Sequence, residues 1–215
     1  HPNQTVFDEV HFGKFISGYF TGEYFFDIHP PLGKLLISGM GYLTGFQPGF
    51  SFADIGEIFP DRHYLWLRFL PALAGTLLAL VIFLLARQLN FFPKASLLAG
   101  LLVIFENALT IQSRFILLDS FLLLFGFSAL LFYFKYRPIE VEPHPSRLNL
   151  DGGWLILTGI FAGLAASVKW TGLAFLGMIL VLELIRLIKS VIPLSKVDSM
   201  ANLIKNLFFT LAGLI

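Results

Sequence analysis

The chain has 215 residues, of which 56% are hydrophobic and 13% are charged, and its formal net charge is +1. Soluble domains carry roughly 25% charged residues, so this composition excludes an ordinary soluble domain and predicts an integral membrane protein. The low net charge gives no electrostatic basis for nucleic-acid binding, and the absence of cysteine excludes disulfides and thiolate metal sites.

Residues 1–63 are predicted to form an exoplasmic first loop that carries short helices. Apolar side chains recur at helical spacing between Val6 and Phe20, which predicts an amphipathic helix lying at the membrane interface. The sequence HPP at residues 29–31 ends this region, because proline removes a backbone donor and restricts the residue before it. A second helix is expected from Leu32 to Leu43, followed by a loop over residues 45–63.

Residues 64–215 are predicted to contain about six membrane spans, which makes the fold all-α, a multi-pass helical bundle. The first span, Phe69–Ala86, is uncharged and would be about 27 Å long, close to the thickness of a bilayer core. The second span, Ala95–Ile111, is interrupted only by Glu106 and Asn107 near its end. The others are Phe115–Phe134, Gly152–Val168, Thr171–Ile185 and a truncated one that begins near Leu207. A single bent element over residues 152–185 is the alternative to the fourth and fifth spans.

The ends of the chain indicate an excerpt. The sequence begins with His1 rather than Met and ends inside an apolar run. We therefore expect residues 1–215 to be the N-terminal part of one transmembrane domain.

The cations of the loops predict the orientation in the membrane. If residues 6–34 define the outer side, nine lysines and arginines fall on the opposite side, which is then cytoplasmic by the positive-inside rule. Six cations lie on the outer side, and their position against the rule indicates another role: Lys14, Lys34, Arg62, Arg68, Arg114 and Lys169.

Asp8 and Glu9 are the first candidate catalytic residues. An acidic pair at the start of a surface helix is often only a solvated pair that favours the helix dipole. A carboxylate beside a low-dielectric surface, however, has a raised proton affinity and can act as a general base toward a hydroxyl.

The stretch DIHPPLGK is the second candidate and contributes Asp27, His29 and Lys34. It can be a turn followed by a helix, with the lysine reaching toward lipid headgroups. It can equally be a phosphate clamp, because the lysine stands at a helix start beside a rigid Pro-Pro turn.

Arg68, Arg114, Asp119 and Lys169 form the third candidate group, since each falls near the outer end of a predicted span. Ionisable groups at this depth are costly and are usually functional or paired. Interfacial anchoring with a structural Arg114–Asp119 pair is the alternative, and Glu106 is expected to cap Arg114 or Lys169. The histidines and carboxylates match no standard metal-site spacing, so no metal site is predicted.

Five segments resemble the protein O-mannosyltransferases, multi-pass glycosyltransferases of the GT-C class. The segments are VFDEVHFGKF, YFFDIHPPLGKLL, RFLPALAGT, ENALTIQSRFILLD and GLAASVKWTGL. They run through essentially the whole chain in the order that the family shows.

The resemblance implies a mannose donor carried on polyprenyl or dolichyl phosphate and a Ser or Thr hydroxyl acceptor on a secreted or membrane protein. It implies that the catalytic aspartate lies in the pair Asp8-Glu9, with Asp8 as the general base of an inverting transfer. Cations among Lys34, Arg68, Arg114 and Lys169 would then stabilise the leaving phosphate, so no metal or other cofactor is expected. The enzyme would lie in the endoplasmic reticulum membrane or a bacterial plasma membrane, with its site on the luminal or exoplasmic side. A homodimer and a heterodimer both stay open.

Two other functions compete with this interpretation. One is a GT-C enzyme that uses the same donor on a lipid or glycan acceptor. The other is a transporter or scaffold without catalysis, in which ionisable residues would line a path near the bilayer midplane. The clustering of ionisable residues at one end of the predicted spans argues against that second alternative.

Overall fold

A computed structural model describes residues 2–137 and 151–191. Regular structure in these residues is helical apart from one isolated bridge between Gln4 and Ile58. Three helices, Tyr64–Gln88, Asp119–Tyr136 and Trp170–Ile188, are long and apolar enough to cross a membrane. The predicted all-α membrane fold is therefore confirmed.

The first loop contains two helices, α1 (Glu9–Thr21) and α2 (Leu32–Leu43), as the sequence predicted. Helix α1 ends at Gly22, whose φ of 74° lies in the left-handed region that glycine adopts without strain. The apolar side chains Phe12 and Ile16 of α1 are buried in the protein core. The apolar face that suggested contact with a membrane is thus covered by the protein itself.

The outer loop that follows α2 is fastened to the N-terminal segment through Thr5. The Thr5 backbone N–H donates to the Glu57 carbonyl at 2.9 Å, and its buried hydroxyl donates to the Asp54 carbonyl at 2.6 Å. Phe52 of the same loop is fully buried, and its ring packs directly on Gly13. A Cβ added to Gly13 would lie only 2.1 Å from the Phe52 Cδ1 atom. A glycine in α1 therefore makes room for the loop that closes over it.

The second predicted span, Ala95–Ile111, is not one helix, and this prediction was wrong. Helix α3 (Tyr64–Gln88) is followed by α4 (Pro93–Phe105), and the chain becomes extended at Glu106 before α5 (Asn107–Gln112). The Glu106 carboxylate accepts from the Leu109 N–H at 2.6 Å and so caps α5. Helix α4 alone, with 13 residues, would be about 20 Å long.

The remaining helices are α6 (Asp119–Tyr136), α7 (Asp151–Val168) and α8 (Leu173–Val191), with a short 3-10 helix, η2 (Trp170–Gly172), before α8. The expected break between the fourth and fifth spans is confirmed. The third span begins later than predicted, because residues 115–118 are not helical and Asp119 is the first residue of α6. The predicted sixth span, near Leu207, lies outside the described residues.

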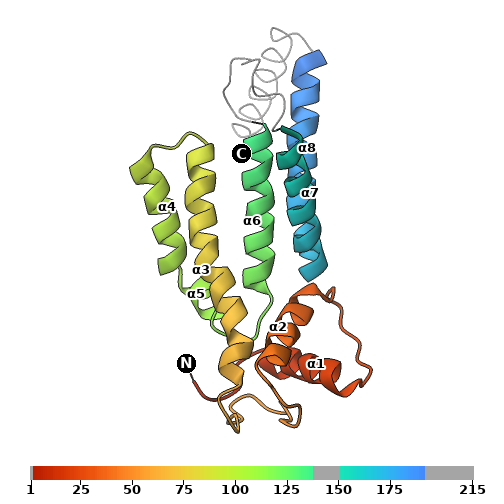
Figure 1. Ribbon diagram of the computed structural model, residues 1–215. Coiled ribbons are helices and arrows are strands. Elements are labelled where there is room, and N and C mark those ends of the chain that lie inside the picture. The colour runs from red at the N-terminus through yellow and green to blue at the C-terminus, as the bar shows by residue number, and fades with distance from the viewer. Residues whose placement is uncertain (1, 138–150, 192–215) are drawn as a thin grey trace, which may run out of the picture. The chain divides into compact units, whose positions relative to one another are not determined.

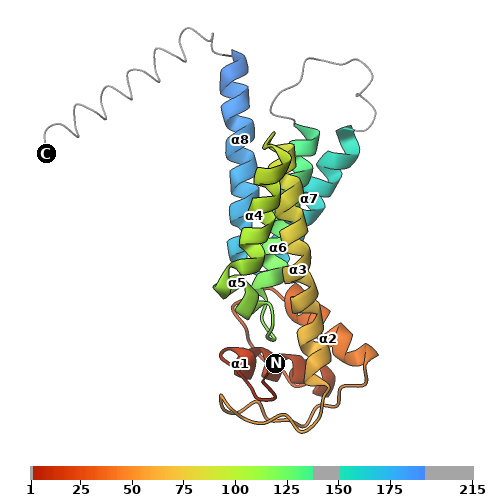
Figure 2. The ribbon, with the colours of Figure 1, turned by 90° about the vertical axis from the view of Figure 1, so that its left-hand side faces the viewer.

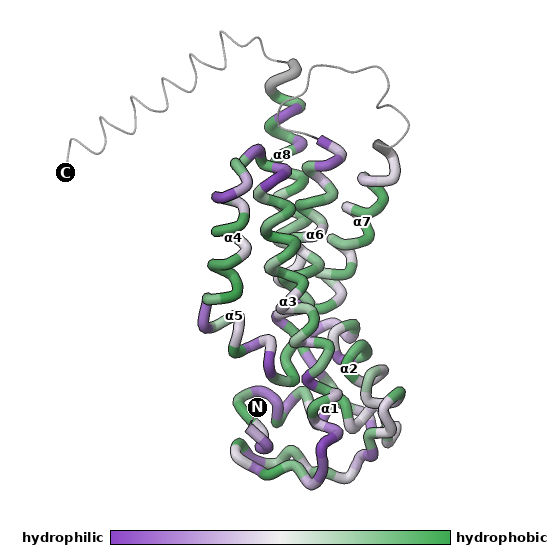
Figure 3. The backbone as a smooth tube through the Cα atoms, turned by 60° about the vertical axis from the view of Figure 1, so that its left-hand side comes forward, coloured by the Kyte–Doolittle hydropathy of each residue, from purple (hydrophilic) through white to green (hydrophobic). Residues whose placement is uncertain are grey.

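The chain divides into two compact units, His1–Phe175 and Leu176–Ile215. In the first unit α6 packs against both α3 and α7, α4 packs on α3, and α2 contacts α3 and α7 (Figures 1 and 2). Figure 3 shows hydrophobic residues along much of α3, α4 and α6, whereas polar residues gather around α1 and the connecting segments. The polar first loop is therefore held against one end of the apolar helices.

Candidate active site

Glu9 and Arg68 form a buried, two-point ion pair between α1 and α3. The Glu9 Oε1 accepts from Arg68 Nε at 2.7 Å, and Glu9 Oε2 accepts from Arg68 Nη2 at 2.6 Å. The side chains are 0% and 2% exposed. Burial of two charges is tolerated when their geometry is good and their remaining polar atoms are also satisfied.

Other segments complete this network. The Glu9 carboxylate also accepts from the backbone N–H groups of Ile116, at 2.8 Å, and Val6, at 2.9 Å. Arg68 donates to the carbonyls of Pro2, at 2.6 Å, and Gln4, at 2.9 Å. Aromatic rings surround its guanidinium at 4.9–5.3 Å: Phe59, Tyr64 and Phe115. The network joins the N-terminal segment, α1, α3 and the segment that precedes α6.

Asp8 has different surroundings from Glu9. It stands at the N-cap of α1, its side chain does not cap the helix, and it is half-buried. Its carboxylate makes no hydrogen bond or ion pair with residues 2–137 or 151–191. The preceding Phe7 has a φ of 52° and is 59% exposed. A bulky residue in this region is strained, and such strain is concentrated at functional sites.

The DIHPPLGK stretch closes on itself through Lys34. The Lys34 Nζ forms an ion pair with the Asp27 carboxylate and donates to the His29 carbonyl at 2.9 Å. Lys34 is 1% exposed. The His29 N–H donates to Asp27 Oδ1 at 3.2 Å, and its ring stacks on Phe12. This geometry makes Lys34 a support for the loop before α2.

Asp119 pairs with Lys169 and not with Arg114, so the structural Arg114–Asp119 pair, which was the alternative to a functional role, is not formed. Lys169 Nζ lies 2.8 Å from Asp119 Oδ1, and the pair joins the beginning of α6 to the end of α7. Glu106 caps α5, as described above, rather than Arg114 or Lys169. The Arg114 guanidinium is exposed and has no hydrogen-bond or ion-pair partner in the part of the chain that the structure describes.

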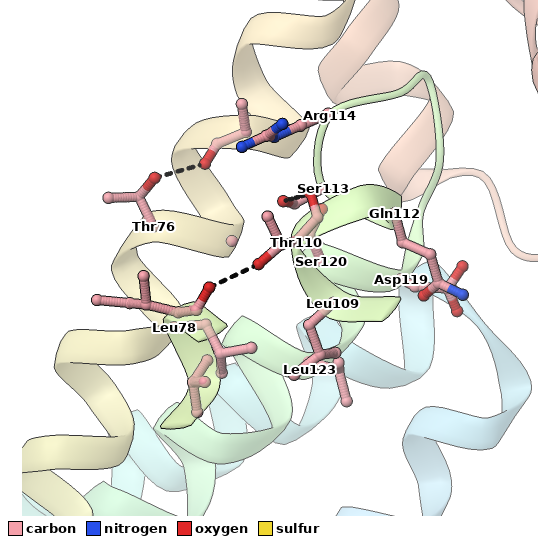
Figure 4. A pocket seen from close by; sticks show the side chains of 14 residues that line it. Thr76, Leu78, Leu109, Thr110, Gln112, Ser113, Arg114, Asp119, Ser120 and Leu123 are labelled. Carbon is pink, nitrogen blue, oxygen red and sulfur yellow. Dashed lines mark hydrogen bonds between the residues drawn. The ribbon is translucent and has the colours of Figure 1, made fainter. Parts of the chain in front are cut away.

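A cavity of about 370 Å³ lies between α3, α5 and the beginning of α6, with α4 contributing to its wall (Figure 4). Its polar lining includes Arg114 and Asp119, which the sequence predicted, and also Thr110, Gln112 and Ser113, which it did not. Apolar side chains line the rest, among them Leu78, Val103, Ile104 and Leu123. The motif ENALTIQSRF contains these residues, but their place in the cavity wall appears only when α5 lies beside α3.

The approach of α3 to this motif depends on a glycine. A Cβ on Gly75 would lie 2.4 Å from the Ser113 Cβ and 2.8 Å from its Oγ. These distances are shorter than side-chain carbons tolerate, so only glycine fits without a shift of the neighbouring segment.

Three titratable groups of the first loop have shifted pKa values. The pKa of Glu57 is lowered, mainly by the hydroxyl of Ser51 and then by the Ala53 and Asp54 N–H groups. The pKa of Asp61 is lowered chiefly by the His63 N–H, and burial raises the pKa of Tyr19, with Asp27 adding to it. The carboxylate shifts reflect bonds that order the outer loop.

Residues suited to a metal ion do not gather in the described ranges. Neither 2–137 nor 151–191 contains a group of three or more histidines, cysteines or carboxylates placed to hold one.

The sequence matches the family profile described as "Dolichyl-phosphate-mannose-protein mannosyltransferase" over residues 1–215. Among curated relatives, dolichyl-phosphate-mannose–protein mannosyltransferase 1 of Candida albicans is 38% identical, covering 86% of this chain and 21% of the relative. Protein O-mannosyltransferase 1 of Drosophila melanogaster is 40% identical, covering 82% and 20%. The chain thus spans about a fifth of the length of these relatives.

A solved structure is also similar. It is the S. cerevisiae protein O-mannosyltransferase Pmt1-Pmt2 complex bound to the sugar donor, with a TM-score of 0.77 and 37% sequence identity. The match covers 86% of this chain and 25% of that one.

Proposed function

The chain belongs to the dolichyl-phosphate-mannose-protein mannosyltransferase family, and we propose that it carries the base and part of the donor site for mannose transfer from a polyprenyl or dolichyl phosphate to Ser or Thr hydroxyls of proteins. The names of its relatives support this donor and this class of acceptor. The observation that supports this assignment is the difference between the two acids. Glu9 is buried in an ion pair with Arg68, whereas Asp8 is only half-buried and its carboxylate can reach a substrate.

In this proposal Asp8 takes the proton of the acceptor hydroxyl. The hydroxyl oxygen attacks the anomeric carbon from the face opposite the phosphate, the bond from that carbon to the phosphate oxygen breaks, and the carrier phosphate leaves with both electrons. The configuration at the anomeric carbon is inverted. Glu9 cannot share this task while its carboxylate accepts four hydrogen bonds, two from Arg68 and one each from Ile116 and Val6.

The cavity beside Arg114 is the proposed place for the donor phosphate. Arg114 has an available guanidinium, and the apolar wall of the cavity suits the first part of a polyprenyl chain. Asp119 and Lys169 would border the sugar and phosphate as a preformed pair. The bond from the Ile116 N–H to Glu9 ties the segment beginning at Arg114 to the residue next to Asp8.

Arg68, Lys34, Asp27 and His29 have a supporting role in this proposal. The polar atoms of Arg68 and Lys34 are engaged within the protein, so each holds a segment that carries the site. Glu9 is likewise a positioning residue.

Replacement of the proposed base tests the function. Asp8→Asn keeps the size of the side chain but cannot accept the proton, and we expect transfer to fall by about 10²–10⁴-fold with unchanged thermal stability. Transfer from a polyprenyl-phosphate-mannose to a Ser/Thr peptide is measured with the whole protein, and donor binding is measured separately. Glu23→Gln is the matched control, because Glu23 is an exposed acid of the same loop. Near-normal turnover by Asp8→Asn would show that another group is the base.

The protein is an integral membrane protein, and we assign its site to the luminal side of the endoplasmic reticulum membrane, or to the outer side of a bacterial plasma membrane. The nine cations on the opposite side of the predicted spans support this orientation. A dimer is proposed as the assembly, because the similar solved structure is a complex of two mannosyltransferases.

A further inference from the structure

Charged and aromatic residues mark one level at the ends of the apolar helices. Asp119 begins the candidate span Asp119–Tyr136, Lys169 directly follows α7, and their side chains are paired at 2.8 Å. Trp170 begins the candidate span Trp170–Ile188. Tryptophan is typical of the boundary between a bilayer and water, and two candidate spans begin at this level, so the boundary is expected here.

The extended segment between α1 and α2 is fastened at the same level. The Trp170 indole N–H donates to the Ile28 carbonyl at 3.0 Å. This bond connects residues 142 positions apart and places the segment before α2 beside the beginning of a span.

Side chains of this segment alternate between the protein and its surroundings, as an extended chain requires. Phe25 faces inward and stacks on Phe15 at 4.9 Å, and the Asp27 carboxylate faces inward to Lys34. Tyr24, Phe26 and Ile28 face outward and are 92%, 76% and 68% exposed. The side of the segment that faces away from the protein is therefore apolar.

We propose that Tyr24, Phe26, Ile28 and Trp170 form an edge that inserts into the outer leaflet of the bilayer, at the boundary between headgroups and acyl chains. This surface is continuous with the start of a membrane span, which favours lipid over a soluble partner. Tyrosine and tryptophan suit the boundary because each joins an apolar ring to a polar tip. The Trp170 N–H is already satisfied by Ile28, so its ring can enter apolar surroundings without losing a hydrogen bond.

In this proposal the DIHPPLGK stretch orients the side chains that contact lipid. Its Asp27–Lys34 ion pair holds the inward face of the segment, and the neighbouring Phe26 and Ile28 are thereby turned toward lipid. These lipid contacts then set how deep the first loop lies in the membrane, and none of them involves the proposed catalytic residue Asp8.

Spin labels on single cysteines test the proposal in the whole protein reconstituted in nanodiscs of phosphatidylcholine. Labels at Tyr24→Cys, Phe26→Cys and Ile28→Cys are compared for collision with oxygen, which concentrates in lipid, and with a water-soluble nickel chelate. We expect collisions with oxygen to dominate at these three positions, as at the lipid control Leu80→Cys, which is exposed on a candidate span. Collisions with the nickel chelate should dominate at Asp54→Cys, a control exposed on the outer loop. Dominance of the nickel chelate at positions 24, 26 and 28 would place the edge in water and overturn the proposal. Low collision with both reagents would show that protein covers the edge and would also overturn it.

A second variant tests the fastening by Trp170. Trp170→Phe keeps an aromatic ring but removes the N–H that bonds to Ile28. We expect the label at Ile28→Cys to shift toward water in this background, while the label at Leu80→Cys stays unchanged. An unchanged ratio at position 28 would overturn the assignment of the indole bond as the fastening. None of these readouts depends on mannose transfer, so they remain informative if the proposed activity is wrong.

Discussion

Glu9 lies inside a closed hydrogen-bonding network with Arg68, and this determines what its replacement would do. Removing one member of a buried ion pair leaves the other charge without compensation. Arg68 would then have neutral carbonyl partners and aromatic rings around its guanidinium but no anionic partner.

We expect Glu9→Gln to lower the free energy of unfolding by about 3–5 kcal/mol, whereas Asp8→Asn leaves it nearly unchanged. Thermal unfolding of the detergent-solubilised variants measures the difference. Equal stability of the two variants would show that the buried pair is not structural.

Arg114 is the outer cation whose substitution should affect the donor most directly. Because it is proposed to contact the leaving phosphate, Arg114→Ala should remove about 2.7–4 kcal/mol of transition-state stabilisation, or roughly 10²–10³-fold in rate. Kinetics with donor and peptide varied separately test this, and the loss should follow the donor. Arg62→Ala, in the outer loop, is the control. A change confined to the peptide's apparent affinity would contradict the phosphate role.

At the scale of an element, Gly75 sets the distance between α3 and the segment that carries Arg114. We expect Gly75→Ala to destabilise the protein by about 1–3 kcal/mol and to weaken donor use, because its Cβ would collide with Ser113. Gly163→Ala in α7 is the matched control, since a Cβ there meets nothing within 4 Å. Thermal unfolding and donor titration are measured for both variants, and equal effects at the two glycines would exclude a specific contact.

The helices and the break after α7 could be predicted from the sequence, but the end of α4 and the side-chain pairings could not. The bounds of α2 follow from the Pro-Pro turn and its apolar pattern, and the structure confirms them. The sequence shows that Glu106 and Asn107 interrupt the apolar run, but it does not show that the helix ends there, because the Glu106 carboxylate acts as a cap only once α5 turns. The alternative structural pair joined Asp119 to its near neighbour Arg114, whereas its partner Lys169 comes from 50 residues away.

The same limit applies to the candidate site. The motifs identified the acidic pair, yet which carboxylate is enclosed depends on Arg68, which lies 59 residues further along the chain. The roles of Asp8, Arg114 and the other site residues stay predictions, because they concern a substrate.

For the whole molecule, the orientation in the membrane makes a prediction that needs no activity assay. A cysteine at Asp54 should react with an impermeant thiol reagent from the luminal or outer side, and one at Lys94 should react only after the membrane is opened. Both positions are exposed, so a difference in labelling reports the side rather than burial. The reverse pattern would overturn the proposed topology.

The network around Glu9 also has a consequence for biosynthesis. Its partner Ile116 is made 107 residues after Glu9, which at about 5–20 residues per second is a delay of about 5–20 s. Until then Glu9 lacks a bond that ties the beginning of α1 to the segment before α6. In a nascent chain Glu9 is therefore held only by Val6 and Arg68 at first, and its network is completed after α3, α4 and α5 have been synthesised.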